Sequence, residues 1–415
     1  MDENALEKAL AIQAVTGTTQ PIGAVLVEQR MIDADTLTRV LEMQRHLFER
    51  RAATFTPADT LSETLLAAAR EAKAAELVVS ENRAVRIRVG NEWRACPGEP
   101  VTGPQVWDFV REVVGYDVLE AVAEHGSVVR SWSHPTHGGG SARIFRHFEG
   151  VAVRIAFAPA PDLTAGDVGL PQAVIDTCRT GRGLILVASE RGIGRGAVMS
   201  VLARAVSHDS SSMVALLDDE PLPLADCRSL VVRHRFGATR AERATAVRDA
   251  VRYDPDALLV ADVGDADVFE ISLRAAEGGR LVVGCIDAAS VAGTLQRVFD
   301  FYRVHDLERV RSSLATTLRA IVTRHAMLHA NGSDTVTANE LLLVDERVRE
   351  ALRKGDLTNI QLLLRAGDGA CGHSLDICML QLLQSGQIRM ADAFARAEEK
   401  AWLLERTKAM NAEVV

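Results

Sequence analysis

Residues 183–302 alternate between short apolar runs and longer segments in which apolar side chains recur every three or four positions. The short runs predict buried strands, and the periodic segments predict amphipathic helices. The predicted strands are 184–188, 213–217, 230–232, 257–262 and 281–286, and the predicted helices are 197–207, 240–252, 267–277 and 290–302. Strands that are apolar on both faces and alternate with helices are typical of a parallel sheet with helices on both sides. The pattern therefore predicts an α/β fold.

Residues 61–160 mix helical and strand patterns without that regular alternation. Helices are predicted at 61–74 and 106–115, and a longer strand region at 142–159. Shorter strands are predicted at 76–80, 85–90 and 92–96. We expect an α+β domain whose sheet packs against two helices.

The two ends of the chain are predicted to be mainly helical. Residues 21–51 predict two short helices joined by a turn, and residues 52–60 have the composition of a linker. Residues 307–415 predict further helices, interrupted by a polar loop at 329–335 and a glycine-rich segment at 366–374. The resulting division is an N-terminal helical module (1–52), an α+β domain (61–165), an α/β domain with C-terminal helices (166–400) and a tail (401–415).

Charge and hydropathy narrow the classes of function. The net charge of −9 gives no basic footprint for nucleic acid, so nucleic-acid binding is not expected. The apolar runs have the length of strands, far below the roughly 18 residues of a membrane span, so no direct membrane insertion is expected. The acidic start, MDENALEKAL, lacks a signal-peptide pattern, and the cytoplasm is the expected compartment.

No metal site is predicted. The six cysteines are scattered and form no C-x-x-C pair. His134 and His137 lie close together in HPTHGGG, but this segment contains no carboxylate or thiol to complete a ligand set. The segment is interpreted as the tip of a hairpin.

The stretch from Gly183 to Gly196, GLILVASERGIGRG, predicts a strand, a glycine-rich turn and the start of a helix. Main-chain N–H groups at such a helix N-terminus can surround a phosphate. A working P-loop also has a Lys for the β- and γ-phosphates and a Ser or Thr for Mg²⁺. The candidate phosphate-binding residues here are Ser189, Gly192, Gly194, Arg195 and Gly196.

Two of these residues depart from a working P-loop. Arg195 keeps a positive charge, but its planar guanidinium does not freely replace a compact ammonium. Gly196 has no oxygen for a metal. Taken alone, the stretch fits an ordinary glycine-rich turn as well as a phosphate-binding loop. Evidence from the rest of the chain is needed to choose between the two.

Three further segments carry a family resemblance. VRYDPDALLVADVGD (251–265), LRAAEGGRLVVG (273–284) and SVAGTLQRVFDFY (290–302) resemble successive signatures of type IV pilus retraction ATPases, the PilT branch of the type II/IV secretion ATPase superfamily. TANELLL, VREALRKGDL and HSLDICMLQLLQSGQI resemble the C-terminal helical region of that branch. The resemblance covers about residues 61–400.

The resemblance implies a PAS-like domain joined flexibly to a RecA-like P-loop domain, assembled as a hexamer with ATP between subunits. It implies a role in twitching motility or secretion, with pilus inner-membrane platform proteins as partners. The expected location is then the cytoplasm, at the periphery of the inner membrane through those partners. The helix pair at 21–51 resembles one copy of an N-terminal module that in some of these ATPases binds cyclic di-GMP, but Pro21 replaces the usual Arg and no second copy follows, so cyclic di-GMP is not expected.

Several positions depart from the family pattern. Asp219 falls where the family has its catalytic Glu, and Glu220 is a candidate to cover for it. Asp262 occupies the Walker B position and retains the chemistry to hold a water on a metal. Asp287 stands where the family has a His near the γ-phosphate, and its carboxylate would repel a triphosphate.

Two arginines of the α+β domain complete the candidate residues. Arg143 and Arg154 lie near the place where the family keeps arginines that reach the neighbouring subunit's nucleotide. A solvated arginine on a strand face is the alternative interpretation of each.

These departures favour a catalytically degenerate PilT-like protein, a pseudo-ATPase that acts as a regulatory or ring partner subunit in a homo-hexamer or a mixed ring. They also weaken the case for ATP and Mg²⁺ as ligands. One alternative is a divergent active ATPase in which Arg195 clamps the phosphates. Another is a signalling adaptor whose N-terminal module senses a second messenger.

Overall fold

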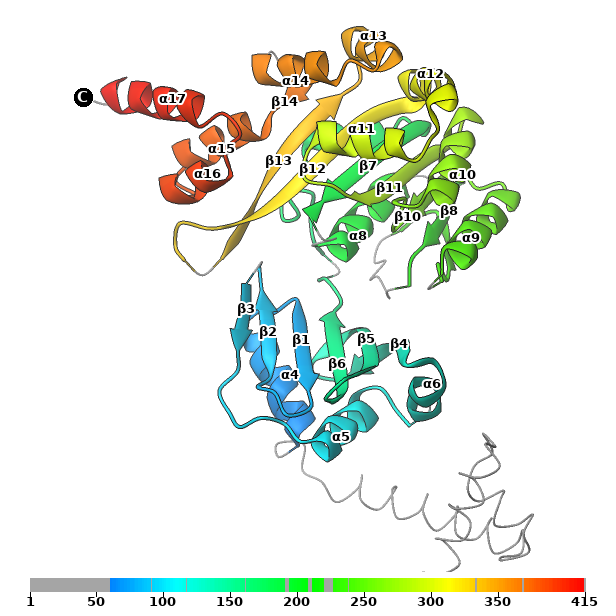
Figure 1. Cartoon of the computed structure of the whole chain (residues 1–415), viewed down its shortest axis with the longest axis vertical. Coiled ribbons are helices and arrows are strands. Elements are labelled where there is room, and N and C mark those ends of the chain that lie inside the picture. Colours follow the sequence, from blue (N-terminus) through cyan, green and yellow to red (C-terminus); the bar gives the residue numbers. More distant parts are fainter. Residues whose placement is uncertain are drawn as a thin grey trace, which may run out of the picture. The chain divides into compact units, whose positions relative to one another are not determined.

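The computed structural model describes residues 60–413, except 91, 117, 161, 191–193, 208–210, 220–226, 238, 333 and 368, with side chains described up to residue 408. The predicted helix pair at 21–51 and the linker at 52–60 lie outside the described residues. The described elements form two sheets with their helices (Figure 1). In this part of the chain, every helix is too short or too polar to span a lipid bilayer.

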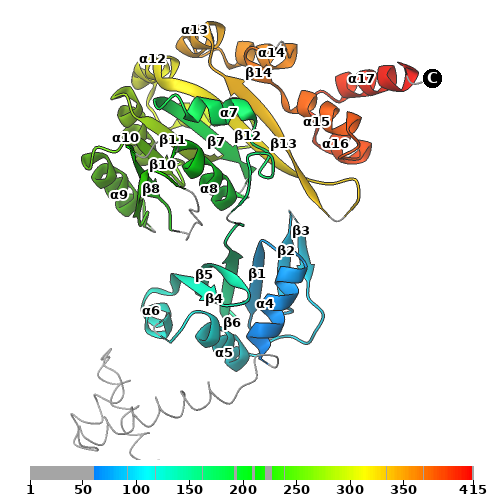
Figure 2. The same ribbon diagram turned by 180° about the vertical axis from the view of Figure 1, so that it is seen from behind.

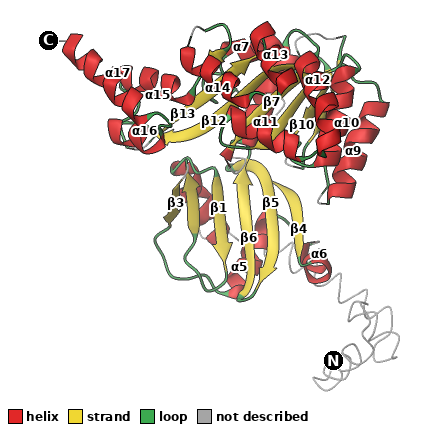
Figure 3. Cartoon of the chain, turned by 45° about the horizontal axis from the view of Figure 1, so that its top comes forward, coloured by secondary structure: helices red, strands yellow, loops and turns green. Residues whose placement is uncertain are grey.

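The N-terminal sheet is antiparallel and has six strands in the order β3-β2-β1-β6-β5-β4. Its elements are α4 (Leu61–Glu71), β1 (Glu76–Ser80), β2 (Arg86–Val89), β3 (Glu92–Ala95), α5 (Gly103–Val113), α6 (Val118–His125), β4 (Ser127–His134), β5 (Gly138–His147) and β6 (Gly150–Phe157). Helices α4 and α5 lie against one face of this sheet (Figure 3). The α+β prediction is confirmed, with α6 as a helix that the sequence pattern did not predict. The PAS-like identity of this part stays a prediction.

The C-terminal sheet has eight strands in the order β14-β13-β12-β7-β11-β10-β8-β9. The six strands from β12 to β9 are parallel, and β13 and β14 are antiparallel to their neighbours. The elements up to the last parallel strand are α7 (Gln172–Cys178), β7 (Gly183–Ser189), α8 (Arg195–Val206), β8 (Met213–Leu217), β9 (Leu230–His234), α9 (Arg240–Arg252), β10 (Ala257–Val260), α10 (Ala266–Glu277), β11 (Leu281–Asp287), α11 (Val291–Asp300), α12 (Leu307–Thr317) and β12 (Leu318–Leu328). The predicted α/β fold is confirmed.

Helices cover both faces of the C-terminal sheet, because its central strands are apolar on both sides. In β7, Leu184 and Leu186 pack into the core under α9, α10, α11 and α12. The alternate residues Ile185 and Val187 pack into the core under α7 and α8. Figure 1 is seen from the side of α10 and α11, and Figure 2 from the side of α7 and α8. The alternation of side chains along a strand explains how one apolar run fills two cores.

The prediction that residues 307–415 are mostly helical is wrong for residues 318–343. They form β12 and β13 (Thr335–Leu343), a long antiparallel pair, and β12 also lies beside β7. The β-branched run Ile321, Val322 and Thr323 favours a strand, and all three side chains are buried between neighbours. The remainder of the tail is helical as predicted, apart from the short β14 (Gly372–His373), in α13 (Glu346–Lys354), α14 (Leu357–Ala366), α15 (Leu375–Gln384), α16 (Met390–Arg396) and α17 (Lys400–Glu413).

Glu340 of β13 should make stability fall as pH rises. Its buried carboxylate accepts a hydrogen bond from Val291 N at 2.7 Å. Burial first, and then the charges of Glu398 and Asp376, raise its pKa to about 7, against the hydrogen bond from Val291 N and the attraction of Arg365. Between the unfolded pKa near 4.3 and the folded pKa, the folded state binds more protons, so its stability decreases with pH.

The substitution Glu340→Gln keeps an acceptor for Val291 N but cannot ionise. We therefore expect the variant to exceed the wild-type free energy of unfolding by about 1 kcal/mol near pH 5 and by about 3–4 kcal/mol at pH 8. Urea unfolding at both pH values measures this difference, with Glu277→Gln on the exposed side of α10 as the control. An equal effect at both pH values would rule out ionisation as the cause.

Candidate functional site

The glycine-rich stretch has the predicted order of strand, turn and helix. Strand β7 ends at Ser189, and α8 begins at Arg195, so Gly196 is the second residue of that helix. Gly194 caps α8 in the left-handed conformation, with φ of 70°, which explains the need for glycine there. Gly192 lies outside the described residues. The helix N-terminus is thus placed at the carboxyl end of the parallel strands, where α/β sheets bind ligands.

Strand register places two charged residues on either side of Ser189. In β11, Asp287 is paired with Ser189, and in β12 Arg324 is paired with the same residue. The sequence analysis predicted Asp287 as part of the site but did not find Arg324. The structure therefore brings one carboxylate and one guanidinium to the end of β7.

Arg324 faces the cap of α8. Its Nε donates a hydrogen bond to Val168 O at 2.8 Å. A Cβ on Gly194 would lie 3.4 Å from Nη1 and 3.7 Å from Nη2 of Arg324. Burial lowers the pKa of Arg324 to about 10, with the Cys285 thiol acting in the opposite direction, so the guanidinium stays charged at neutral pH.

Arg195 has a main-chain hydrogen-bond partner next to β10. Its Nη1 donates to Ala261 O at 3.1 Å, which directs the guanidinium to the residue after β10. The buried Cys285 thiol, whose pKa burial raises to about 12, feels the positive charges of both Arg195 and Arg324. Both cations thus act on Cys285 near the carboxyl end of β11, and Arg324 also lies against Gly194.

Asp262, the candidate Walker B residue, already has partners. Its Oδ2 accepts a hydrogen bond from Arg243 Nη1 at 3.0 Å in a half-buried ion pair, and its Oδ1 accepts one from Gly264 N at 2.9 Å. The Arg243 guanidinium also lies over the Phe236 ring, 5.3 Å from its centre. A carboxylate with a neighbouring guanidinium is less available to a metal and its waters.

Asp219, the candidate catalytic residue, caps a turn. Its Oδ1 accepts hydrogen bonds from Phe236 N and Gly237 N, both at 3.0 Å. Glu220 lies outside the described residues. Asp287 is exposed, and its main-chain oxygen accepts a hydrogen bond from Arg297 Nη1 at 3.2 Å. The carboxylates of Asp219 and Asp262 therefore have local structural partners, and the catalytic roles of all these acidic residues stay predictions.

Arg143 and Arg154 are paired across β5 and β6, and both side chains are exposed. Arg154 binds Glu76 of β1 through Nε and Nη2, at 2.6 and 2.7 Å. Arg154 thus has a structural ion pair within the N-terminal sheet. A reach to a neighbouring subunit's nucleotide stays a prediction for both arginines.

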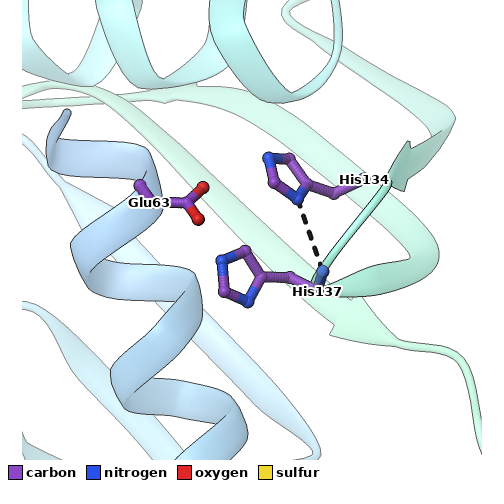
Figure 4. A group of neighbouring side chains, drawn as sticks. All are labelled: Glu63, His134 and His137. Carbon is purple, nitrogen blue, oxygen red and sulfur yellow. Dashed lines mark hydrogen bonds between the residues drawn. The ribbon is translucent and has the colours of Figure 1, made fainter. Parts of the chain in front are cut away.

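The HPTHGGG segment turns between β4 and β5, as predicted. Thr136 N and His137 N donate to Nδ1 of His134 at 3.3 and 3.4 Å, and the two imidazole rings stack with centres 4.8 Å apart (Figure 4). Figure 4 also draws Glu63 of α4, and among the described residues one ligand atom from each of the three lies within 4.8 Å of the others. The sequence analysis missed this carboxylate because Glu63 is about 70 positions away. The prediction that no metal binds here rested on the lack of a carboxylate or thiol near the two histidines. The position of Glu63 removes that reason.

Besides Glu63, sequence reasoning missed Arg324 and Arg243. Arg324 was hidden because its segment was predicted to be helical, although the β-branched run just before it indicates a strand. Arg243 lies on the polar side of a correctly predicted helix, where a charged residue carries no signal of its partner. Only the fold brings each of them to the site.

Comparison with known proteins gives the family. The family described as "Type II/IV secretion system protein" matches residues 146–354, just over half of the chain. A twitching motility protein of Neisseria gonorrhoeae is 23% identical over 314 residues, covering 75% of this chain and 84% of that protein. The type IV pilus retraction ATPase PilT of Pseudomonas aeruginosa is 23% identical over 339 residues, covering 80% of this chain and 97% of PilT.

Solved structures agree on the fold. A crystal structure of the pilus retraction motor PilT with bound ADP superimposes with a TM-score of 0.68 at 23% identity, covering 82% of this chain and 97% of PilT. The Legionella pneumophila ATPase DotB gives a TM-score of 0.67 at 16% identity, covering 82% of this chain and 95% of DotB. Family match, chain-long similarity and fold together lead to one assignment: the chain belongs to the type II/IV secretion system protein family and is of the PilT type.

Proposed function

We propose that this protein is a ring subunit of a type IV pilus or secretion machine that binds nucleotide without driving rapid hydrolysis. PilT-type relatives are named as pilus retraction and twitching motility proteins, and one solved PilT holds ADP. This protein shares the overall fold of that PilT structure. It acts as a regulatory or partner subunit, in its own hexamer or in a mixed ring with an active motor.

The observation that carries this proposal concerns Gly196 and Asp262, the two positions that would hold Mg²⁺ in a working P-loop ATPase. Gly196 offers no hydroxyl to Mg²⁺, and the Asp262 carboxylate is paired with Arg243. Phosphoryl transfer depends on a positioned metal and on neutralisation of the phosphate charge. When the metal ligands are missing or already paired, nucleotide binding is retained more easily than nucleotide hydrolysis.

The alternative of a divergent active motor requires Arg195 to clamp the phosphates. The hydrogen bond from Arg195 Nη1 to Ala261 O already engages that guanidinium with the residue after β10, which argues against this role. The alternative of a second-messenger adaptor depends on residues 1–52, which lie outside the described residues. The cytoplasmic side of the inner membrane, with pilus platform proteins as partners, is the proposed place of action.

Co-assembly with an active motor tests the ring-partner role. The purified protein is mixed in increasing ratio with the PilT-type ATPase of the same organism, while particle mass and ATP turnover are followed. We expect mixed rings and a turnover rate that changes with the ratio, because a subunit without hydrolysis alters its neighbours in the ring. Separate particles with an unchanged rate per active subunit would contradict this role.

A further inference from the structure

We propose that Arg324 replaces the missing P-loop lysine, supplying from β12 the positive charge that holds the phosphates of a nucleoside di- or triphosphate at the start of α8. This inference rests on the proposed nucleotide binding and assigns it to a residue outside the glycine-rich stretch. The lysine position itself holds Arg195, whose guanidinium donates to Ala261 O, so the phosphate contact of the lysine is regained from another part of the sequence.

The first argument is position. Arg324 is paired with Ser189 in the β12–β7 register, so its Cα lies beside the last residue of the strand that enters the turn. Its Nη1 and Nη2 lie 3.4 and 3.7 Å from the point where a Cβ on Gly194 would be. Gly194 is the cap of α8, so the guanidinium lies next to the N–H groups that open the helix. Guanidinium and helix N-terminus together form a site for an anion.

The second argument is charge. Among the described residues, no carboxylate forms an ion pair with Arg324, and the hydrogen bond of its Nε goes to a neutral main-chain oxygen, Val168 O. Arg243, by contrast, is paired with Asp262. A partly buried guanidinium whose Nη groups lie beside a helix N-terminus is suited to an anionic ligand, because a phosphate would supply the missing counter-charge. Burial lowers its pKa only to about 10, so the charge persists at neutral pH.

The third argument is the hydrogen bond that fixes the side chain. The bond from Nε to Val168 O holds the guanidinium plane while leaving both Nη groups on the side of Gly194. A planar fork held in this way can bind two phosphate oxygens at once. A lysine at this place would keep the charge but lose the fork. The conservative variant Arg324→Lys therefore separates charge from geometry.

The test measures nucleotide affinity with the full-length protein. Adenosine, AMP, ADP and ATP are titrated by calorimetry, with and without Mg²⁺, into wild type and variants. We expect Arg324→Gln to weaken ADP binding by at least about tenfold, the usual cost of a lost hydrogen bond to a charged group, and to leave adenosine binding unchanged. The ADP affinity of Arg324→Lys should lie between those of wild type and Arg324→Gln. The salt dependence of ADP binding should be smaller in Arg324→Gln than in wild type.

Arg319→Gln is the matched control, because Arg319 lies in the same strand at its other end. Thermal melting shows whether each variant is folded, and adenosine affinity shows whether the base site is intact. Unchanged ADP affinity in a folded Arg324→Gln variant would overturn this inference and leave the proposed nucleotide binding standing. Failure of the wild-type protein to bind any nucleotide would overturn both. A larger loss from Arg195→Ala than from Arg324→Gln would assign the clamp to Arg195 instead.

Discussion

Purified protein supplied with Mg-ATP should release phosphate at least about 1,000-fold more slowly than a PilT-type ATPase with an intact P-loop. That factor corresponds to about 4 kcal/mol of lost transition-state stabilisation, a size that removal of one or two charge-stabilising groups commonly produces. The measurement is a phosphate-release assay at saturating ATP, with the intact relative assayed in parallel.

The expected loss has two separate causes in the structure. On the metal side, Gly196 has no oxygen and Arg243 occupies the Asp262 carboxylate, so Mg²⁺ has poor anchorage. On the water side, Asp219 accepts two main-chain hydrogen bonds at the turn formed by Phe236 and Gly237. Arg324 adds a positive charge beside the phosphates, but a guanidinium does not replace the bridging of phosphate oxygens by a metal.

Double variants of α8 and α9 test the contribution of the metal-binding positions separately from that of Asp219. Combining Gly196→Ser with Arg243→Ala restores a hydroxyl and frees Asp262, so we expect nucleotide binding to become more dependent on Mg²⁺. Gly196→Ser with Arg240→Ala is the matched control. Arg240 lies in α9 like Arg243, but it is exposed and pairs with Asp265 at the start of α10. Wild-type turnover within tenfold of the intact relative would contradict the assignment of a degenerate site.

The α/β part of the fold could be predicted closely from the sequence, because its local signals agree with its packing. Strand β8 and helix α9 have the predicted bounds. Helix α9 starts where Thr239 and Glu242 form a capping box, a signal visible in the sequence. Such elements are bounded by their own residues, so periodicity alone locates them.

The candidate site could be predicted only in part, because its partners come from distant segments. The glycine-rich turn and Asp287 follow from the order of strands in a parallel sheet. Arg324 could not be placed without knowing that β12 is a strand beside β7, a fact set by tertiary pairing. The pairing of Asp262 with Arg243 likewise depends on side-chain directions that a one-dimensional pattern does not contain.

The second large effect is expected in the N-terminal sheet, where Glu76 joins two arginines. Glu76 is 5% exposed and binds Arg88 at 2.6 Å and Arg154 at 2.6 and 2.7 Å. Burial lowers the pKa of Arg88, and the Glu76 carboxylate acts in the opposite direction. Replacing Glu76 with Ala would leave a nearly buried Arg88 beside Arg154 without a counter-ion. Breaking a buried pair in this way typically costs about 3–5 kcal/mol.

We therefore expect Glu76→Ala to lower the melting midpoint of this sheet by roughly 10 °C or more, since a domain of about 100 residues shifts by several degrees per kcal/mol. Tryptophan fluorescence reports mainly on this region, because Trp93, Trp107 and Trp132 belong to it and only Trp402 does not. The matched control is Glu149→Ala, which removes an exposed pair with Arg83 and should leave the midpoint unchanged. Equal melting of the two variants would show that the buried cluster contributes no more than a surface pair.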